Sequence, residues 1–215
     1  MAVSELSEYV KRYTKLAHAV AALKSQKLVL PNPSSWDDSN DQEFVKLYRR
    51  HISAKSIYAM CCTMSAERYH HWRIFTEKND ASGVCIEFKR EPLQAALNRI
   101  RNVRAEPVKY VTLKTLRETG RYRPEDLPFI KRVGYSDERE WRILVTSPGP
   151  QGSLFEIPFN LAWVHRIILN PWMDERERES ARRVLRPLIE KSARISATFL
   201  TNSAEWKELG KRLVR

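Results

Sequence analysis

Two glutamates separated by one residue, Glu138 and Glu140, stand at the start of a strand-like segment of the sequence, GYSDEREWRILV. Glu is a poor strand former, so its presence here needs an explanation. One explanation is an edge strand protected by charge, with ion pairs to the neighbouring arginines worth roughly 0.2–1 kcal/mol each. The other is an active site. Alternate residues of a strand share a face, so both carboxylates would point into one cleft and could stabilise positive charge that develops as a bond breaks.

Two earlier segments carry further side chains that could bind a ligand. Arg12 lies in the strand-like segment EYVKRYT, and Thr63 and Ser65 lie at the end of a second one, SIYAMCCTM. An arginine can hold a phosphate, and hydroxyl groups can hydrogen-bond a ligand. The alternatives are ordinary: Arg12 would be a solvated cation among lysines, and Thr63 and Ser65 would cap the next helix.

The segment NDASGVCIEFK suggests a different chemistry. Asp80, followed by Glu87 and Lys89 on a predicted strand, resembles the Asp…Glu-x-Lys core of metal-dependent nucleases. There the carboxylates hold Mg²⁺ and the lysine helps to activate water. Against this hypothesis, Glu-x-Lys is a common pair on ordinary strands.

The cysteines and histidines do not predict a metal site. The three cysteines, Cys61, Cys62 and Cys85, lack a C-x-x-C spacing, and His70 and His71 have no partners at zinc-binding distances along the chain. We expect free buried thiols in a reducing compartment.

The charge of the chain suggests a polyanionic partner. Lys and Arg number 38 against 26 Asp and Glu, a net charge of +12, with a pI near 9.8. A non-catalytic nucleic-acid-binding module is therefore a third hypothesis, supported by mixed aromatic and basic segments such as GRYRPED and KLYRRHISAK. No signal peptide or membrane-spanning stretch is apparent, so we expect a cytoplasmic protein that does not enter the membrane.

Short strands and helices must position these groups. Apolar alternation predicts a strand over residues 83–90, and β-branched, aromatic and thiol residues predict a buried one over 56–64. The segment SLFEIPF, residues 153–159, is expected to form a hairpin with the strand that starts at Glu140, and a helix should start near Asp174. These patterns favour one α+β domain over residues 1–215, with a mixed, largely antiparallel sheet. Residues 171–215 would form a helical closing segment or a partner-binding face.

The order of these pieces resembles a widespread bacterial family of unknown function. The matching segments are YVKRYTKLAHAVAALKSQKLVLPNPSSWDD, YAMCCTMS, HHWRIFTEKNDASGVCIEF, VKY and KRVGYSDEREWRIL. The family pattern contains L-x-(F/L)-x-x-P-x-x-(F/W)-N-D-P, C-F-S, a Trp-Tyr-Gly segment and E-x-E-W-R. The chain departs from it twice, because WDDSND replaces Asn-Asp-Pro and Phe75 stands where Tyr is more usual.

Arg12 on a first strand, the element Thr63-Met64-Ser65 at the end of a second, and Glu138-Arg139-Glu140 opening a late one occur in that order. This order is similar to that in toxin-type ADP-ribosyltransferases, and the resemblance implies a function. In those enzymes an Arg or His, a Ser-Thr-Ser or Tyr element and a Glu, often as Glu-x-Glu, surround NAD. The implied reaction cleaves NAD at the nicotinamide–ribose bond and transfers ADP-ribose to a macromolecule, with NAD as substrate. The positive charge favours a nucleic-acid acceptor. The analogy also suggests a toxin or phage-defence role with an antitoxin or other protein partner.

The resemblance further implies roles for individual residues. Glu140 would be the catalytic group at the NAD ribose, and Glu138 would position the acceptor. The implied NAD contacts are Arg12, Tyr13, Thr63 and Ser65, with Trp72 or Phe75 stacked on the nicotinamide.

Overall fold

The computed structural model describes residues 7–75, 82–119, 122–149, 152 and 154–214. Its strands are β1 (Tyr9–Lys15), β2 (Lys27–Pro31), β3 (Ser56–Thr63), β4 (Gly83–Lys89), β5 (Val103–Pro107), β6 (Lys109–Val111), β7 (Ile130–Arg132), β8 (Glu140–Ser147), β9 (Leu154–Pro158), β10 (Val164–Leu169) and β11 (Arg194–Ala197). Its α-helices are α1 (Leu16–Ser25), α2 (Ser39–His51), α3 (Tyr69–Phe75), α4 (Arg90–Leu97), α5 (Leu113–Thr119), α6 (Glu175–Leu185) and α7 (Ala204–Leu213). Short 3₁₀ turns are η1 (Pro33–Ser35), η2 (Pro124–Phe129), η3 (Val133–Glu138), η4 (Leu161–Trp163) and η5 (Arg186–Leu188).

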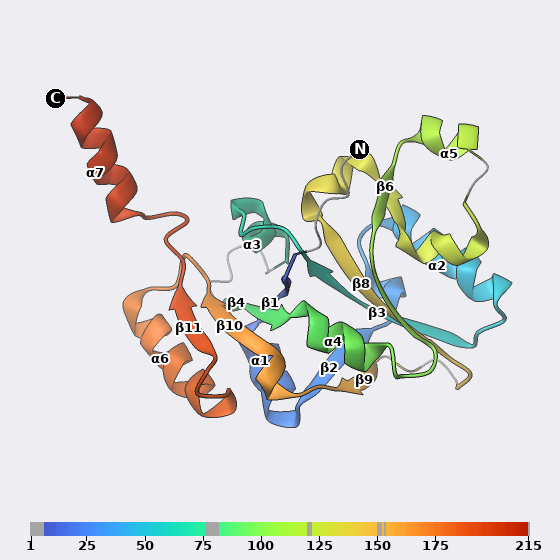
Figure 1. Cartoon of the computed structure of the whole chain (residues 1–215), viewed down its shortest axis with the longest axis horizontal. Helices are drawn as coiled ribbons and strands as arrows, with labels where there is room; N and C mark the ends of the chain where they lie inside the picture. The colour runs from blue at the N-terminus through green and yellow to red at the C-terminus, as the bar shows by residue number, and fades with distance from the viewer. Residues whose placement is uncertain (1–6, 76–81, 120–121, 150–151, 153, 215) are drawn as a thin grey trace.

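The centre of the fold is a seven-stranded sheet in the order β11-β10-β4-β1-β3-β8-β5 (Figure 1). Its strand pairs are antiparallel except for β10 with β11, which is parallel. Two-stranded ladders, β2 with β9 and β6 with β7, flank it. The predicted α+β class with a largely antiparallel sheet is therefore confirmed.

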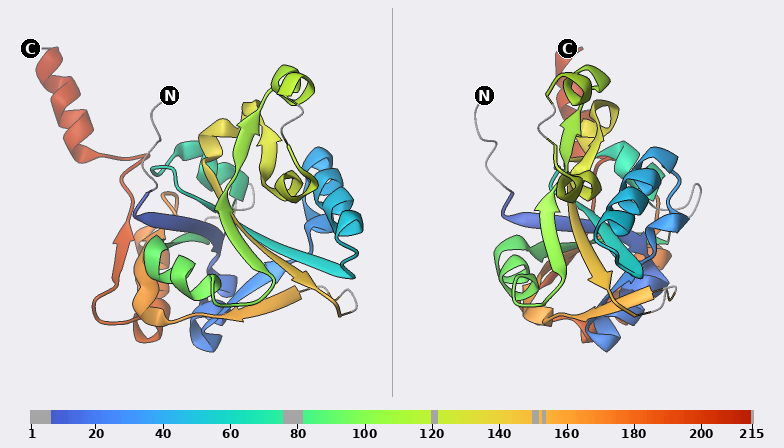
Figure 2. Two further views of the ribbon diagram at one scale, coloured as in Figure 1. Left: turned by 45° about the vertical axis from the view of Figure 1, so that its right-hand side comes forward. Right: turned by 90° about the vertical axis from the view of Figure 1, so that its right-hand side faces the viewer.

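The sheet is joined at its middle by a very short ladder. Strands β1 and β3 share the single register pair Lys11 with Thr63 in this described part of the chain, whereas β1 pairs with β4 along its whole length. Beyond that pair the two strands diverge, so the four strands from β11 to β1 and the three from β3 to β5 form the two arms of a fork (Figure 2).

Strand β3 is buried on both faces, as its composition predicts. Tyr58 and Met60 belong to the main core beneath α1 and α4, whereas Ile57 and Ala59 pack in a second core with α2. Side chains at alternate positions of a strand point to opposite faces, so the polar end of β3 opens onto the α2 side. This is the side on which the charged residues of β8 also lie.

The predicted hairpin between the segments that form β8 and β9 is wrong. Strand β9 pairs with β2 in antiparallel register, from Lys27 opposite Pro158 to Pro31 opposite Leu154. The reason is that β8 already has β3 on one side and β5 on the other, which leaves it no free edge. A local turn signal could not reveal that occupancy.

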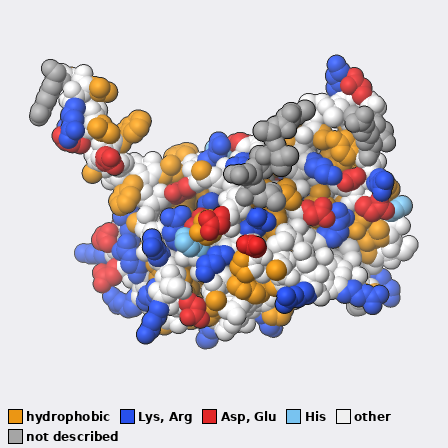
Figure 3. Space-filling view, in the orientation of Figure 1, with side chains coloured by type: hydrophobic (Ala, Val, Ile, Leu, Met, Phe, Trp, Pro, Cys, Tyr) orange, Lys and Arg blue, Asp and Glu red, His pale blue; other side chains and the backbone are white. Residues whose placement is uncertain are grey.

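Residues 171–215, predicted as a helical segment, also contain η5 and the strand β11, which pairs with β10 in the main sheet. The helices α6 and α7 of this region differ in how they pack. Helix α6 begins at Glu175, and the predicted Asp174 is its N-cap. The Asp174 carboxylate accepts from Glu177 N and the Glu177 carboxylate accepts from Asp174 N, which is a reciprocal capping box. Helix α7 extends away from the sheet (Figures 1 and 3). It buries none of its described residues, and Trp206 is 80% exposed. None of the helices in the described ranges is long and apolar enough to cross a membrane.

Candidate active site

A cavity of about 460 Å³ opens where β1 and β3 diverge. Its volume is within the range of small-molecule sites, roughly 300–1,000 Å³. The lining residues come from both arms of the fork and from the loops above it: Lys11, Arg12, Tyr13, Pro31, Ser35, Trp36, Asp37, Asp38, Asp41, Ala59, Cys61, Cys62, Thr63, Ile74, Lys131, Tyr135, Glu138 and Glu140. The cavity thus gathers segments that are far apart along the chain.

Both glutamates line this cavity, but strand alternation is not what brings them together. Glu138 ends the η3 turn, Glu140 begins β8, and between them Arg139 adopts a left-handed conformation with φ 42°. The two carboxylates do line one cavity, but the predicted reason, a shared face of one strand, is wrong, because Glu138 does not lie on the strand. A reversal at Arg139, whose carbonyl accepts from Met64 N at 2.9 Å, turns Glu138 toward the same space.

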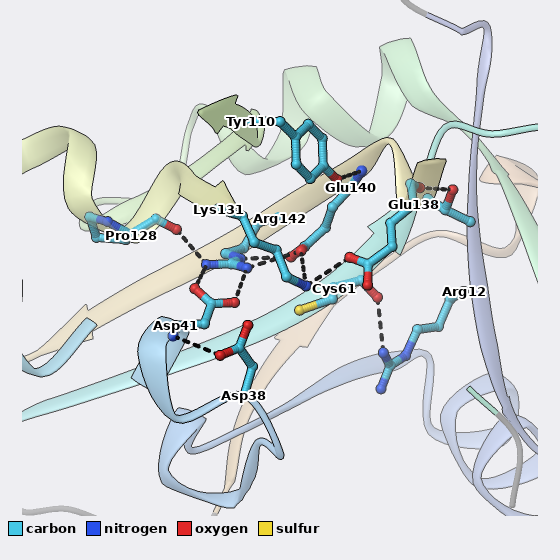
Figure 4. A network of polar contacts seen from close by, with 11 residues as sticks. Arg12, Asp38, Asp41, Cys61, Tyr110, Pro128, Lys131, Glu138, Glu140 and Arg142 are labelled. Carbon is cyan, nitrogen blue, oxygen red and sulfur yellow. Dashed lines mark hydrogen bonds and ion pairs between the residues drawn. The ribbon is translucent and has the colours of Figure 1, made fainter. Parts of the chain in front are cut away.

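Glu140 belongs to a buried chain of charges (Figure 4). Its Oε1 accepts from Arg142 Nε at 2.7 Å and its Oε2 from Arg142 Nη2 at 3.0 Å. Arg142 has no exposed surface and also donates to both oxygens of Asp41, at 2.9 and 2.7 Å, and to Pro128 O at 2.6 Å. Burial alone would raise the pKa of Glu140, but the charge of Arg142 outweighs it and lowers that pKa to about 2. The carboxylate is therefore ionised at neutral pH.

Lys131 links the two glutamates. Its Nζ lies 2.7 Å from Glu138 Oε2 and 3.4 Å from Glu140 Oε2. Burial lowers the pKa of Lys131, but the carboxylates more than reverse this, so the amine stays charged. Burial raises the pKa of Glu138, an effect that Lys131 only partly offsets. The site therefore holds two carboxylates of different proton affinity, a pattern typical of paired catalytic acids and bases.

Arg12 and Tyr13 reach the cavity from the other arm of the fork. Arg12 Nη1 donates to the carbonyl of Cys61 at 2.9 Å and so bridges the two diverging strands. Tyr13 is buried and lies edge-on to Trp72, with ring centroids 4.8 Å apart. Burial raises the pKa of Tyr13, so it is a neutral phenol.

Thr63 and Ser65 hold the loop that carries Glu138. The Thr63 hydroxyl donates to Glu138 O and accepts from Ser65 N at 2.9 Å. Ser65 is buried and is not one of the cavity-lining residues. Neither residue caps the next helix, because α3 begins at Tyr69. Thr63 thus lines the cavity directly, whereas Ser65 supports it only by donating its backbone N–H to the Thr63 hydroxyl.

The aromatic rings at the cavity differ from those predicted. Trp72 has no exposed surface and donates from Nε1 to Glu67, so it belongs to the core and is not available to stack on a ligand. The Phe75 side chain lies outside the described residues. Among the described residues, the rings that line the cavity beside Tyr13 are Trp36 and Tyr135. Both were missed, although Trp36 belongs to the WDDSND segment that departs from the family pattern.

Three solved structures of DarT from Thermus sp. 2.9 are similar to this chain. The complex with ADP-ribosylated ssDNA has 11% identity and a TM-score of 0.47, covering 89% of this chain and 94% of that one. The complexes with carba-NAD+ and NAD+ have 11% and 12% identity and TM-scores of 0.43 and 0.41, covering 89% and 92% of this chain and 96% and 98% of theirs. No protein-family model matches the sequence. No curated protein matches it significantly. At this identity, with scores below 0.5, the function must be argued from the site.

The arrangement around Glu87 does not favour a nuclease. Its carboxylate is buried between Lys11 and Arg166, at 3.3 and 2.8 Å, and Lys89 donates to a backbone carbonyl, Ala162 O. Asp80 lies outside the described residues. Within the described ranges, no group of three His, Cys, Asp or Glu side chains is placed to hold a metal ion. Glu87 is thus neutralised by the protein's own cations.

Proposed function

We propose that this protein is an NAD-consuming ADP-ribosyltransferase that acts on nucleic acid. The observation that carries the proposal is the convergence of Arg12, Glu138 and Glu140 on one cavity, since they come from β1, η3 and β8. A binding module would need no buried carboxylate held ionised at the wall of a cavity. Such a group is costly to bury, and perturbed carboxylates of this kind cluster at functional sites.

Glu140 is the residue we propose for the chemical step. Its carboxylate, fixed by Arg142, would accept a hydrogen bond from a ribose hydroxyl of NAD. As the bond between the ribose C1′ and the nicotinamide nitrogen breaks, both bonding electrons leave with nicotinamide. The negative charge of Glu140 would stabilise the positive charge that develops on the ribose, and a preorganised charge does so without reorganising.

Glu138 and Arg12 would assist from two different elements of the cavity wall, η3 and β1. The raised pKa of Glu138 makes it the better proton acceptor of the pair, so it would position the acceptor nucleophile and take its proton as the new bond to C1′ forms. Arg12 would hold a phosphate of NAD. Trp36 and Tyr135 offer aromatic faces for the nicotinamide or adenine ring.

The proposed acceptor rests on charge. A net charge of +12 favours a polyanion over most proteins as the second substrate. A toxin or phage-defence role, and an antitoxin partner, stay predictions from the resemblance alone.

The direct test is nicotinamide release from NAD by the purified protein, with and without single-stranded DNA or RNA. NAD+ and DNA are suitable first probes because the DarT complexes contain NAD+ and ADP-ribosylated ssDNA. We expect the wild type to release nicotinamide and Glu140→Gln to be at least about 100-fold slower. Glu156→Gln is the matched control, since Glu156 is exposed on β9 and is not a lining residue. No release by the wild type in any condition would refute the proposal.

A further inference from the structure

An aromatic and basic cluster occupies the surface beside α3. The Arg73 guanidinium carbon lies 4.0 Å from the ring centre of Trp172 and 5.6 Å from that of Tyr69. The rings of Tyr69 and Trp172 meet edge to face, with centroids 5.3 Å apart. Tyr69 is 51% exposed although it is aromatic, and Trp172 is only partly buried. We refer to Arg68, Tyr69, Arg73 and Trp172 as the α3 surface.

The same helix connects this surface to the cavity. Ile74, which is 62% exposed, lines the cavity from α3, and Trp72 packs on Tyr13 in the cavity wall. His70 Nε2 lies 2.8 Å from Asp137 Oδ2, which ties α3 to the η3 turn that carries Glu138. Helix α3 also packs against β1 (Figure 1). The aromatic cluster and the cavity therefore share helix α3.

Cations continue from this surface along the sheet. Arg68 Nε donates to Ser65 Oγ at 2.9 Å, and Ser65 O accepts from Lys11 Nζ at 3.1 Å. Lys11 and Arg166 share the carboxylate of Glu87, so that group of three keeps a net positive charge. Hydrogen bonds through Ser65 thus connect Arg68 of the α3 surface to the buried Lys11 at the cavity wall.

We propose that the α3 surface binds single-stranded nucleic acid and leads one nucleotide of it toward the cavity. The exposed ring of Tyr69 beside arginines suits an unpaired base, because every base has a face that can stack while the arginines contact phosphates. A duplex hides its base faces and could use only the charges. The inference rests on the proposed function for its purpose, but the binding itself does not require NAD.

Binding is measured by fluorescence anisotropy with labelled oligonucleotides and without NAD. The probes are a mixed-sequence single-stranded DNA, the same sequence as RNA, and the corresponding duplex. We expect Tyr69→Ala and Arg73→Ala each to weaken single-strand binding about fivefold or more, whereas Tyr69→Phe keeps it because the ring remains. Arg73→Ala should also lower the salt dependence, the slope of log K against log salt, by roughly 0.7.

The controls remove an exposed arginine and an exposed aromatic residue elsewhere in the chain. Arg183→Ala removes an exposed arginine of α6, and Trp206→Ala removes an exposed aromatic residue of α7. Both should bind like the wild type, and thermal melting should show each variant folded. The inference is overturned if the wild type binds neither single strand, if it prefers the duplex, or if the α3 variants bind as tightly as the controls.

This outcome can be separated from that of the nicotinamide assay. Single-strand binding that depends on Tyr69 and Arg73, without nicotinamide release, would support the α3 surface as a binding site and refute the proposed reaction. Conversely, the protein could release nicotinamide while Tyr69→Ala and Arg73→Ala bind single strands as tightly as the wild type. That result would support the proposed reaction and refute the α3 surface as the binding site.

Discussion

Arg142 binds both oxygens of the Glu140 carboxylate, with Nε 2.7 Å from Oε1 and Nη2 3.0 Å from Oε2. The same guanidinium binds both oxygens of Asp41, which lies 101 positions earlier in the chain. One buried cation therefore fixes the proposed catalytic group and anchors the start of α2 to β8. This geometry leads to the first prediction.

Replacing Arg142 should destabilise the protein strongly. Arg142→Met leaves two buried carboxylates without their shared cation, and breaking a buried ion pair in this way costs about 3–5 kcal/mol. Arg132→Met, at an exposed position at the end of β7, should change the free energy of unfolding by less than about 0.5 kcal/mol. Urea denaturation of both variants checks this, and equal stabilities would contradict the structural role of Arg142.

Stability should fall in acid because of Glu140. Its pKa is about 2 in the folded protein against an ordinary 4.5, so folding favours the ionised form. That contribution is fully present above about pH 4.5 and is lost as pH falls toward about 2. Glu138, whose pKa is raised, contributes with the opposite sign.

The variant Glu138→Gln separates these two effects. Without Glu138, urea midpoints measured between about pH 5 and pH 2.5 should show a steeper loss of stability with falling pH than in the wild type. A midpoint that stays constant over this range in the variant would show that Glu140 is not held ionised by folding.

Trp36 and Trp72 should behave differently toward NAD. Trp36 lines the cavity, so Trp36→Ala should weaken NAD binding about fivefold or more, if an aromatic ring stacks on a base of the ligand. Trp72→Phe should lower the melting temperature but leave NAD affinity unchanged, because Trp72 is enclosed in the core. Isothermal titration and thermal melting together check this. A larger affinity loss at Trp72 than at Trp36 would reverse the assignment.

Helix α7 should be dispensable for folding. Its described residues are all unburied, so removing residues 199–215 exposes little apolar surface. The truncated protein should melt within a few degrees of the full chain and retain nicotinamide release. A large drop in melting temperature would mean that α7 packs on the domain in solution.

The sequence alone determined the local character of the fold. The alternation of Val84, Ile86 and Phe88 specified β4, and Asp174 with Glu177 specified the start of α6. These features depend on periodicity and on hydrogen bonds between near neighbours, which a reader of the sequence can see. The Glu-x-Glu spacing likewise marked the segment that reaches the cavity.

Only the tertiary structure decided which groups meet. The cavity exists because β1 and β3 separate after the pair of Lys11 with Thr63, and no local pattern encodes that divergence. Three further features depend on contacts between distant segments. They are the burial of Trp72 rather than Trp36, the pairing of β9 with β2, and the ion pairs of Arg142 with Asp41 and Glu140. Periodicity predicts that a side chain is buried or exposed; the choice of its partner is a property of the whole packed chain.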